Sequence, residues 1–172
     1  MELWDIYDKE RVKTDKTIER GKEISEDEFH LVVHICIFNS DGEMLIQQRQ
    51  PFKEGWSNMW DITVGGSAVK GETSGMAAER ELFEEIGYRA DLSSQRPFVT
   101  INFCVGFDDY YLIQRNVDID KLTLQYEEVQ RVKWATKDEI LNMIDKGSFI
   151  PYYRSLIEML FEMRNHLGAH RA

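Results

Sequence analysis

The chain has 172 residues, 42% of them hydrophobic, and its 31 acidic residues outnumber its 21 basic ones, which gives a formal net charge of −10. This charge argues against broad contact with a nucleic-acid backbone or an anionic lipid surface. The sequence contains no run of about 18 apolar residues and no basic and apolar start typical of a secretory signal. We therefore expect a single domain over residues 1–172, no membrane span, no nucleic-acid polymer as partner, and a cytoplasmic location.

Residues 1–27 precede the first long apolar segment. They begin with a strand-like piece from Trp4 to Asp8 and continue into a highly charged stretch. Two structures fit this pattern, namely an extra hairpin docked on a sheet or an N-terminal arm. The aromatic residues Trp4 and Tyr7 favour the docked hairpin.

The next segments predict strands. Glu28 to Phe38 is apolar on both faces, as expected of a central strand, and Met44 to Arg49 forms a second strand after a turn at Asn39 to Gly42. Trp60 to Val64 predicts a short strand that leads into the glycines at 65 and 66. A hairpin therefore precedes the glycines.

A loop, a helix and a second loop are predicted over residues 66–88. Thr73 or Ser74 can cap the start of the helix, and Gly87 suits the left-handed residue that ends it. The stripe expected to face the core is Ala77, Ala78, Leu82 and Ile86. The helix therefore has a second face that is free for solvent or for chemistry.

The C-terminal half predicts more strands and two helices. Phe98 to Phe107 and Tyr110 to Arg115 suggest a hairpin around Asp108 and Asp109, and Val129 to Trp134 completes the strands. A capping box that begins at Thr136 opens a helix that runs to about Lys146. A last helix is expected from Pro151, with a buried stripe of Tyr152, Leu156, Met159, Leu160 and Met163.

The second face of the 66–88 helix carries Glu81, Glu84 and Glu85, related as i, i+3 and i+4, so their carboxylates lie over one turn. Each like-charged i,i+4 pair costs roughly 0.2–0.5 kcal/mol, and a bound cation would remove that repulsion. Hard carboxylate oxygens suit Mg²⁺ or Mn²⁺. A solvated acidic face is the alternative, and the flanking residues decide between the two.

Those flanking residues follow a longer pattern, whose positions of fixed identity are Gly66, Glu72, Arg80, Glu81, Glu84, Glu85 and Gly87. The pattern resembles the signature of the Nudix hydrolases, with Tyr88 where an aliphatic residue is usual. This resemblance implies an α/β fold, specifically an α/β/α sandwich with a mixed sheet. It also implies Mg²⁺- or Mn²⁺-dependent cleavage of the diphosphate linkage in a small anionic metabolite, either a nucleoside diphosphate joined to another group or a related diphosphate.

The same resemblance implies roles for individual residues. Glu81, Glu84 and Glu85 become metal ligands, with the backbone carbonyl of Gly65 as a further ligand, and Arg80 orients the glutamates. Glu72 either braces the loop or helps to hold a second ion. We count Arg80, Glu81 and Glu85 among the catalytic candidates.

Hydrolysis also needs a base to take a proton from the attacking water. Glu81 is one candidate, and Glu128 is favoured by the family resemblance over its neighbour Glu127. For substrate binding we select Arg49, whose bidentate fork suits phosphate, and Trp60, which offers an aromatic face.

Cysteine and histidine suggest no separate chemistry. Cys36 and Cys104 lie in apolar runs and are expected to be buried thiols. His30 and His34 point to the same side of their strand, which permits a metal pair but fits hydrogen-bonded histidines better.

Two rival functions stay open. The N-terminal piece and the segment from His30 to His34 loosely resemble the Nudix subgroup that includes the isopentenyl diphosphate isomerases. Those isomerases place a catalytic cysteine just before the signature glycine and a metal-binding histidine just after it, where this chain has Gly65 and Ser67. The hydrolase is therefore favoured over the isomerase. The other rival is a non-catalytic ligand-binding module, and the intact glutamates argue against it. Separately, the family resemblance implies a homodimer.

Overall fold

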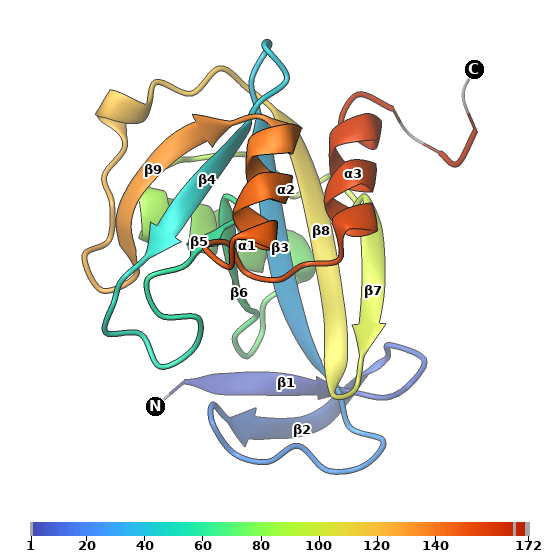
Figure 1. The fold of residues 1–172 in the computed structure, drawn as a ribbon. Helices are drawn as coiled ribbons and strands as arrows, with labels where there is room; N and C mark the ends of the chain where they lie inside the picture. Colours follow the sequence, from blue (N-terminus) through green and yellow to red (C-terminus); the bar gives the residue numbers. More distant parts are fainter. Residues whose placement is uncertain (1, 167, 171–172) are drawn as a thin grey trace.

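The structure is a computed structural model that describes residues 2–166 and 168–170. Its elements, in chain order, are β1 (Leu3–Tyr7), β2 (Lys13–Glu19), β3 (His30–Phe38), β4 (Met44–Arg49), β5 (Trp60–Asp61), β6 (Val64–Ser67), α1 (Ser74–Ile86), β7 (Val99–Phe103), β8 (Gly106–Gln114), a 3-10 turn (Ile119–Lys121), β9 (Val129–Ala135), α2 (Lys137–Asp145) and α3 (Arg154–Met163). Helix α1 lies behind the large sheet in Figure 1, and α2 and α3 lie in front of it. The α/β/α sandwich with a mixed sheet that was expected from the sequence is confirmed.

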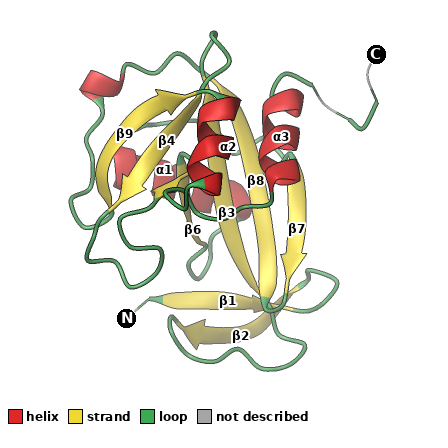
Figure 2. Ribbon diagram, in the orientation of Figure 1, coloured by secondary structure: helices red, strands yellow, loops and turns green. Residues whose placement is uncertain are grey.

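The large sheet has seven strands, of which five run in the order β5-β4-β3-β8-β7 (Figure 2). Strand β6 pairs with β3 and β9 pairs with β4. The β3–β8 pair is parallel, whereas the others are antiparallel. Within the β3–β6 pair, His34 lies opposite Gly65 and Val33 opposite Gly66. The two glycines therefore lie beside the middle of β3, the central strand of the sheet.

Two hydrophobic clusters fill the space between the layers. Val33, Ile35 and Ile37 of β3 pack with helix α1 on one side of the sheet. Cys36 and Phe38 of the same strand pack with α2 and α3 on the other side. Alternation along β3 thus supplies both cores, which is why this strand is apolar on both faces.

Helix α1 has the ends and the buried stripe expected from its sequence. The Thr73 side chain accepts a hydrogen bond from the backbone N–H of Met76, and Gly87 ends the helix with φ at 68°. All four residues of the expected apolar stripe are buried. Tyr88, the departure from the Nudix signature, is partly buried against the same cluster. The apolar stripe therefore holds the helix against the sheet.

The N-terminal residues form an antiparallel hairpin, β1–β2, at one end of the large sheet (Figures 1 and 2). Backbone hydrogen bonds join Tyr7 and Phe29 in both directions, at 2.8 and 3.0 Å. The Trp4 ring stacks on His30 with ring centroids 4.5 Å apart. Of the two structures left open by the sequence, the docked hairpin is the one observed.

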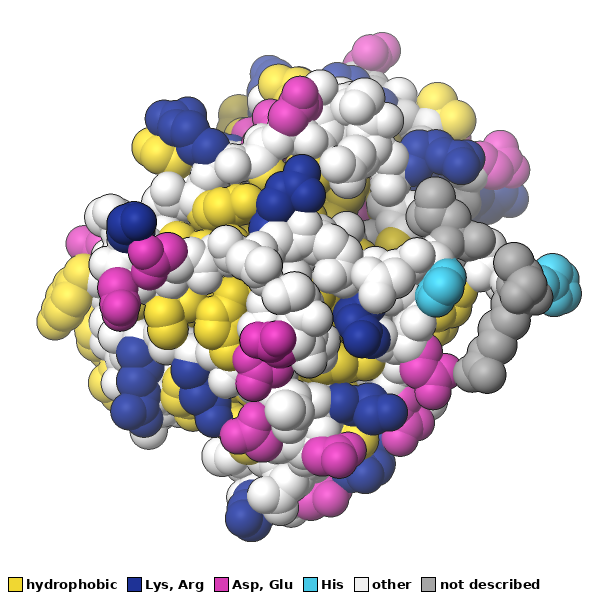
Figure 3. All heavy atoms as spheres, turned by 90° about the horizontal axis from the view of Figure 1, so that it is seen from above, with side chains coloured by type: hydrophobic (Ala, Val, Ile, Leu, Met, Phe, Trp, Pro, Cys, Tyr) yellow, Lys and Arg dark blue, Asp and Glu magenta, His cyan; other side chains and the backbone are white. Residues whose placement is uncertain are grey.

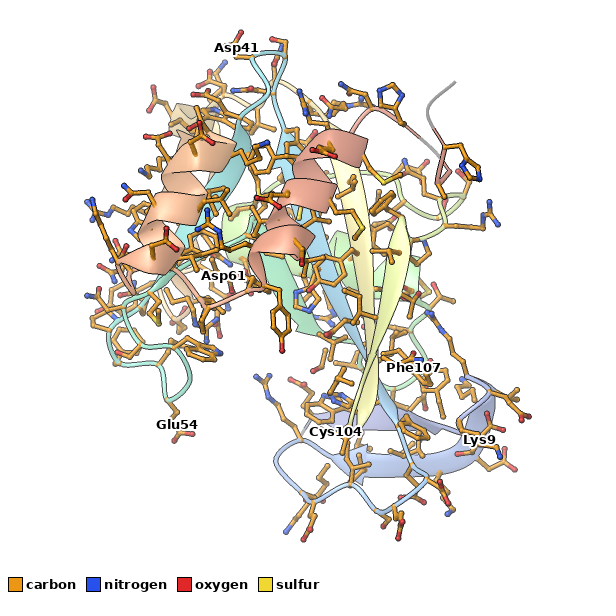
Figure 4. All side chains as sticks on the ribbon, turned by 45° about the vertical axis from the view of Figure 1, so that its right-hand side comes forward. Lys9, Asp41, Glu54, Asp61, Cys104 and Phe107 are labelled. Atoms are coloured by element: carbon orange, nitrogen blue, oxygen red, sulfur yellow. The ribbon has the colours of Figure 1, made fainter. Side chains whose placement is uncertain are left out.

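Three expectations for local structure were wrong. Asp108 and Asp109 lie inside β8, because the hairpin turns earlier, at Cys104 and Val105. Cys104 is exposed for the same reason, as its position in Figure 4 shows, whereas Cys36 is buried as expected. Helix α3 begins at Arg154.

The buried stripe of α3 also differs from the expected one. Its fully buried side chains are Ile157, Leu160 and Phe161, whereas the expected Leu156 and Met159 are only partly buried. A later first residue does not change which side chains share a face of the helix. The difference between the expected and the observed buried residues therefore reflects how α3 packs beside α2. None of the helices described reaches the length and apolarity that crossing a bilayer requires.

Acidic and basic side chains are mixed on the face of the molecule seen in Figure 3. No extended patch of one sign covers that face.

Candidate active site

The acidic face of α1 lies directly against the glycines of β6. A Cβ added at Gly66 would lie 2.2 Å from Oε1 of Glu81, well inside any permitted contact. Only glycine therefore lets the Glu81 carboxylate approach the strand so closely. This contact gives a physical reason for the first glycine of the Nudix signature.

Arg80 joins three carboxylates at this surface. Its Nε and Nη2 donate to the two oxygens of Glu72, at 2.7 and 3.0 Å. Its Nη1 donates to Glu81 at 2.8 Å and to Glu84 at 3.0 Å, and Nη2 also donates to the carbonyl of Ser67 at 3.0 Å. The surrounding carboxylates raise the pKa of Arg80, with the hydrogen bonds to Glu72 as the largest cause. Arg80 is placed to orient the glutamates beside it.

Glu85 is a buried carboxyl group without a cation. Its residue is only 5% exposed, and Nε2 of Gln47, on β4, donates to it at 2.8 Å. No lysine, arginine or histidine within the described residues forms an ion pair with it. Burial raises the pKa of Glu85 well above its ordinary value, and the nearby charge of Glu81 raises it further. An uncompensated site of this kind suits a cation.

Burial also raises the pKa of Glu81, to about 7, although the positive charge of Arg80 opposes the shift. Two carboxyl groups one turn apart thus have raised pKa values in the metal-free protein, and burial is the largest cause for both. Such shifts are concentrated at functional sites.

The three glutamates do not converge on one point. In the part of the chain that the structure describes, no group of three or more His, Cys, Asp or Glu side chains is arranged to hold a metal ion. Glu81 and Glu84 turn to the guanidinium of Arg80, whereas Glu85 turns to Gln47. The expectation that the carboxylates gather over one turn is therefore met only in part, because Arg80 satisfies two of them.

The donor set nonetheless fits a hard divalent cation. Every candidate ligand is a carboxylate or carbonyl oxygen, as Mg²⁺ and Mn²⁺ prefer. Beside Glu85, the side-chain oxygen of Gln47 is buried and has no hydrogen-bond partner among the described residues. An unpaired buried oxygen is costly, and a cation or its hydration water would satisfy it.

Glu128, the favoured candidate for the base, and its neighbour Glu127 directly precede β9. Glu128 is half-buried, and the ammonium of Lys53 lies 2.6 Å from its carboxylate. The backbone N–H of Gln50 also donates to the carbonyl of Glu128, at 3.0 Å. Glu127 is exposed. The structure therefore distinguishes these neighbours, since only Glu128 is held by the loop over residues 50–59.

The two substrate-binding candidates differ in exposure. Arg49 is half-buried, with its Nε donating to the carbonyl of Gly55 at 3.1 Å. Trp60 is only 9% exposed and belongs to the core beneath α2 and α3. Arg131 and Lys133 both lie over its ring, 5.3 Å from the centroid. Trp60 therefore has little free ring surface for a ligand.

Other aromatic residues have the exposure that Trp60 lacks. Phe52 and Trp56 lie on the loop over residues 50–59, which projects to a tip at Glu54 in Figure 4. Phe52 faces Tyr126 with ring centroids 5.8 Å apart, and Tyr126 is 72% exposed. This contact joins the 50–59 loop to the segment that carries Glu128.

Comparison with known proteins identifies the family. Residues 28–154 match the model of the NUDIX domain. The chain belongs to the Nudix hydrolase family. An uncharacterized Nudix hydrolase of Listeria innocua is 48% identical over 170 residues, which is 99% of each chain. A crystal structure of a Deinococcus radiodurans protein has the same fold, with a TM-score of 0.74, 23% identity, and coverage of 94% of this chain and 98% of that one.

The isomerase resemblance noted in the sequence also has a counterpart among relatives. An isopentenyl-diphosphate Delta-isomerase of Pectobacterium atrosepticum is 29% identical over 119 residues, covering 66% of this chain and 65% of that protein. In this Nudix hydrolase, a Cβ added at Gly65 would lie 3.1 Å from Nδ1 of His34. Position 65 therefore offers no ready space for a thiol.

Sequence reasoning missed several polar residues around the Nudix site. Gln47 had a detectable signal, because it is polar in an apolar strand and shares the face of Leu45 in β4. Lys53 and Asp61 had none. Asp61 is buried and accepts a hydrogen bond from the Tyr152 hydroxyl at 2.8 Å, and Figure 4 shows it at the base of α3. Burial raises the pKa of Asp61.

Proposed function

We propose that this Nudix hydrolase uses Mg²⁺, or Mn²⁺ in its place, to cleave the diphosphate linkage of a small anionic metabolite. The substrate class is a nucleoside diphosphate joined to another group, or a related diphosphate. The observation that carries the proposal is Glu85, a buried carboxyl group with no cation of its own, next to an unpaired oxygen of Gln47. Such a site gains most from a divalent ion.

The proposal assigns the metal to Glu81, Glu84, Glu85 and the carbonyl of Gly65. When bound, the ion draws charge from the bridging and leaving oxygens of the diphosphate. Arg80 fixes the positions of the Glu81 and Glu84 carboxylates relative to one another through its hydrogen bonds. Little covalent work remains for the protein, whose contribution is positioning and charge.

Glu128 is the proposed base, with Glu81 as the other candidate. Lys53 holds the Glu128 carboxylate in place through their ion pair, and a carboxylate fixed in this way suits the role of accepting a proton from water. Arg49, which is half-buried, is the proposed contact for a substrate phosphate, and Trp60 supports that strand end from the core.

The isomerase is the second candidate because a relative carries that name. The residues disfavour it. Gly65 and Ser67 supply neither the thiol nor the histidine of the isomerase pattern, and the space at Gly65 is limited by His34. Without a thiol at that face, the carbon acid–base step lacks its donor.

A panel assay tests these alternatives. ADP-ribose, UDP-glucose, GTP and isopentenyl diphosphate would each be incubated with the wild type, with and without Mg²⁺. Release of phosphate or a monophosphate in Mg²⁺ supports the hydrolase, whereas conversion of isopentenyl to dimethylallyl diphosphate supports the isomerase. Metal-independent release, or no product together with no uptake of Mg²⁺ by calorimetry, would defeat the proposal.

A matched pair of neighbours tests the base. Glu128→Gln should lower kcat by about 100-fold, within the usual range for the loss of a general base. Glu127→Gln changes the adjacent exposed residue in the same way and should leave kcat unchanged. If both variants kept the kcat of the wild type, Glu81 would become the proposed base.

The proposal has two further features, of which the homodimer comes from the family resemblance and the cytoplasmic location from the sequence. We infer a homodimer in the cytoplasm. Sedimentation velocity at several protein concentrations measures the first, and fractionation of cells measures the second. A monomer at all concentrations would remove the dimer from the proposal without affecting the chemistry.

A further inference from the structure

The β1–β2 hairpin contacts the loop that opens helix α1. The carboxylate of Asp5 accepts a hydrogen bond from the backbone N–H of Gly71 at 2.7 Å, and the carbonyl of Leu3 accepts one from the N–H of Lys70, also at 2.7 Å. Asp5 is 7% exposed. This hairpin lies outside residues 28–154, which match the family model.

A second contact reaches the first turn of α1. Arg11, in the turn between β1 and β2, forms a bidentate ion pair with Asp109 of β8, with one of its contacts at 2.8 Å. The hydroxyl of Ser74, the first residue of α1, donates to the same carboxylate at 2.5 Å. Tyr111 donates to Ser74 at 2.9 Å. Asp109 is completely buried, so its charge depends on Arg11 for compensation.

The anchored loop leads directly to the glutamates. Gly71 precedes Glu72, both of whose oxygens accept hydrogen bonds from Arg80. Arg80 in turn holds Glu81 and Glu84. Asp5 is therefore connected to two of the proposed metal ligands through its hydrogen bond to Gly71, the peptide link from Gly71 to Glu72, and the hydrogen bonds of Arg80.

We propose that the N-terminal hairpin is a positioning element of the active site, and that Asp5 and Arg11 are its positioning residues. Asp5 fixes the loop that carries Glu72, and Arg11 fixes the first turn of α1 through Asp109. Neither residue contacts the substrate or the ion in this proposal. The inference rests on the proposed function, because it concerns ligands for a divalent ion.

The loop that contains Gly71 and Glu72 depends on the hairpin for its local order. Gly71 has φ at 88°, a conformation open to glycine, so the loop has no side chain there to hold it. If the Asp5 carboxylate is removed, the hydrogen bond that still ties this loop to the hairpin is the one between the N–H of Lys70 and the carbonyl of Leu3. Orienting groups behind metal ligands typically contribute about 10–100-fold to metal affinity or activity. The hairpin, which lies outside the Nudix signature, would raise metal affinity or activity in this way.

The test uses the full chain and four variants. Asp5→Ala removes the acceptor, Asp5→Asn keeps an oxygen acceptor, and Arg11→Met removes the ion pair. Lys16→Met, the control, removes an exposed ion pair with Glu28 in the same part of the chain. Mn²⁺ alone is the probe, and its free concentration is followed by electron paramagnetic resonance. Hydrogen exchange of residues 69–80 and kcat and KM for the best substrate of the panel are measured in parallel.

Asp5→Ala and Arg11→Met should bind Mn²⁺ roughly 10-fold more weakly and lose kcat by a similar factor, with KM within about twofold. Exchange should rise over residues 69–80, Asp5→Asn should recover most of the loss, and Lys16→Met should match the wild type. If Arg11→Met does not fold, the comparison of Asp5→Ala with Asp5→Asn still tests the role of the hairpin. Wild-type Mn²⁺ affinity in Asp5→Ala would overturn this inference alone. No Mn²⁺ uptake by the wild type would overturn the proposed function and this inference with it.

Discussion

Residues 66–88 and the hairpin over residues 3–19 lie against each other, yet only the first segment shows its chemistry in its sequence. In the 66–88 segment, the spacing of Glu81, Glu84 and Glu85 follows the helix and is visible in the chain alone. In the hairpin, Asp5 and Arg11 act through partners that are distant in sequence, such as Asp109. Ligands that share one helix can be read locally, whereas the residues that orient them cannot.

The largest effect is expected inside the 66–88 segment. Glu85→Gln should lower kcat by about 100-fold or more, because it removes a ligand charge while keeping the size of the side chain. Initial rates in Mg²⁺ measure the loss, and circular dichroism checks the fold. Glu162→Gln, on the exposed side of α3, serves as control. A fully active Glu85→Gln protein would show that the ligand assignment is wrong.

The next effect tests the close contact between helix and strand. Gly66→Ala adds a Cβ that would meet the Glu81 carboxylate, so the carboxylate must move by about 1 Å or more, and turnover should fall roughly 10–100-fold. Gly55→Ala is the control, because a Cβ there has nothing within 4 Å. Rates of the two variants, measured at equal Mg²⁺, give the comparison. Normal turnover in Gly66→Ala would mean that the position of Glu81 matters little.

A smaller effect is expected where the two regions meet. Asp109→Asn leaves Arg11 without its counter-charge and should lower the free energy of unfolding by about 2 kcal/mol, less than for a fully buried pair because Arg11 is partly exposed. Urea unfolding measures the difference. Asp118→Asn, in an exposed pair with Lys121, should leave the midpoint unchanged. An unchanged midpoint in Asp109→Asn would show that the hairpin is only loosely attached.

The smallest effect is a pH dependence of the metal-free protein. The folded state holds protons on Glu81 up to a pKa of about 7, and Glu85 is shifted in the same direction, whereas unfolded glutamates release theirs near 4.5. The stability that these shifts provide is present in full below the unfolded pKa and is lost as pH rises toward 7.

Glu85→Gln should therefore be more stable than the metal-free wild type at pH 8, because only the wild type must ionise a buried carboxyl group there, and the difference in stability should close at pH 4.5. Thermal unfolding in a chelator measures both values. Saturating Mg²⁺ should reverse the order at pH 8. A gap of the same size at both pH values would mean that ionisation of Glu85 is not its cause.

Much of the fold could be predicted because it depends on local rules. The caps of α1 at Thr73 and Gly87, its apolar stripe and the capping box at Thr136 are each decided by a few neighbouring residues. The turn at Cys104 was mistaken for one at Asp108 and Asp109 because aspartates favour turns. Here burial against Arg11, Ser74 and His34 outweighs that preference.

The family, the α/β/α sandwich and the helix that carries Glu81, Glu84 and Glu85 follow from the amino-acid sequence, because helical spacing and the signature act over a few turns. That Arg80 satisfies two of these carboxylates while Glu85 is buried beside Gln47 follows from the packing of the folded chain. That packing alone also placed Lys53 on Glu128 and the hairpin on the loop before α1. These contacts join residues far apart in the chain, and their energies depend on burial and distance, which no local pattern records.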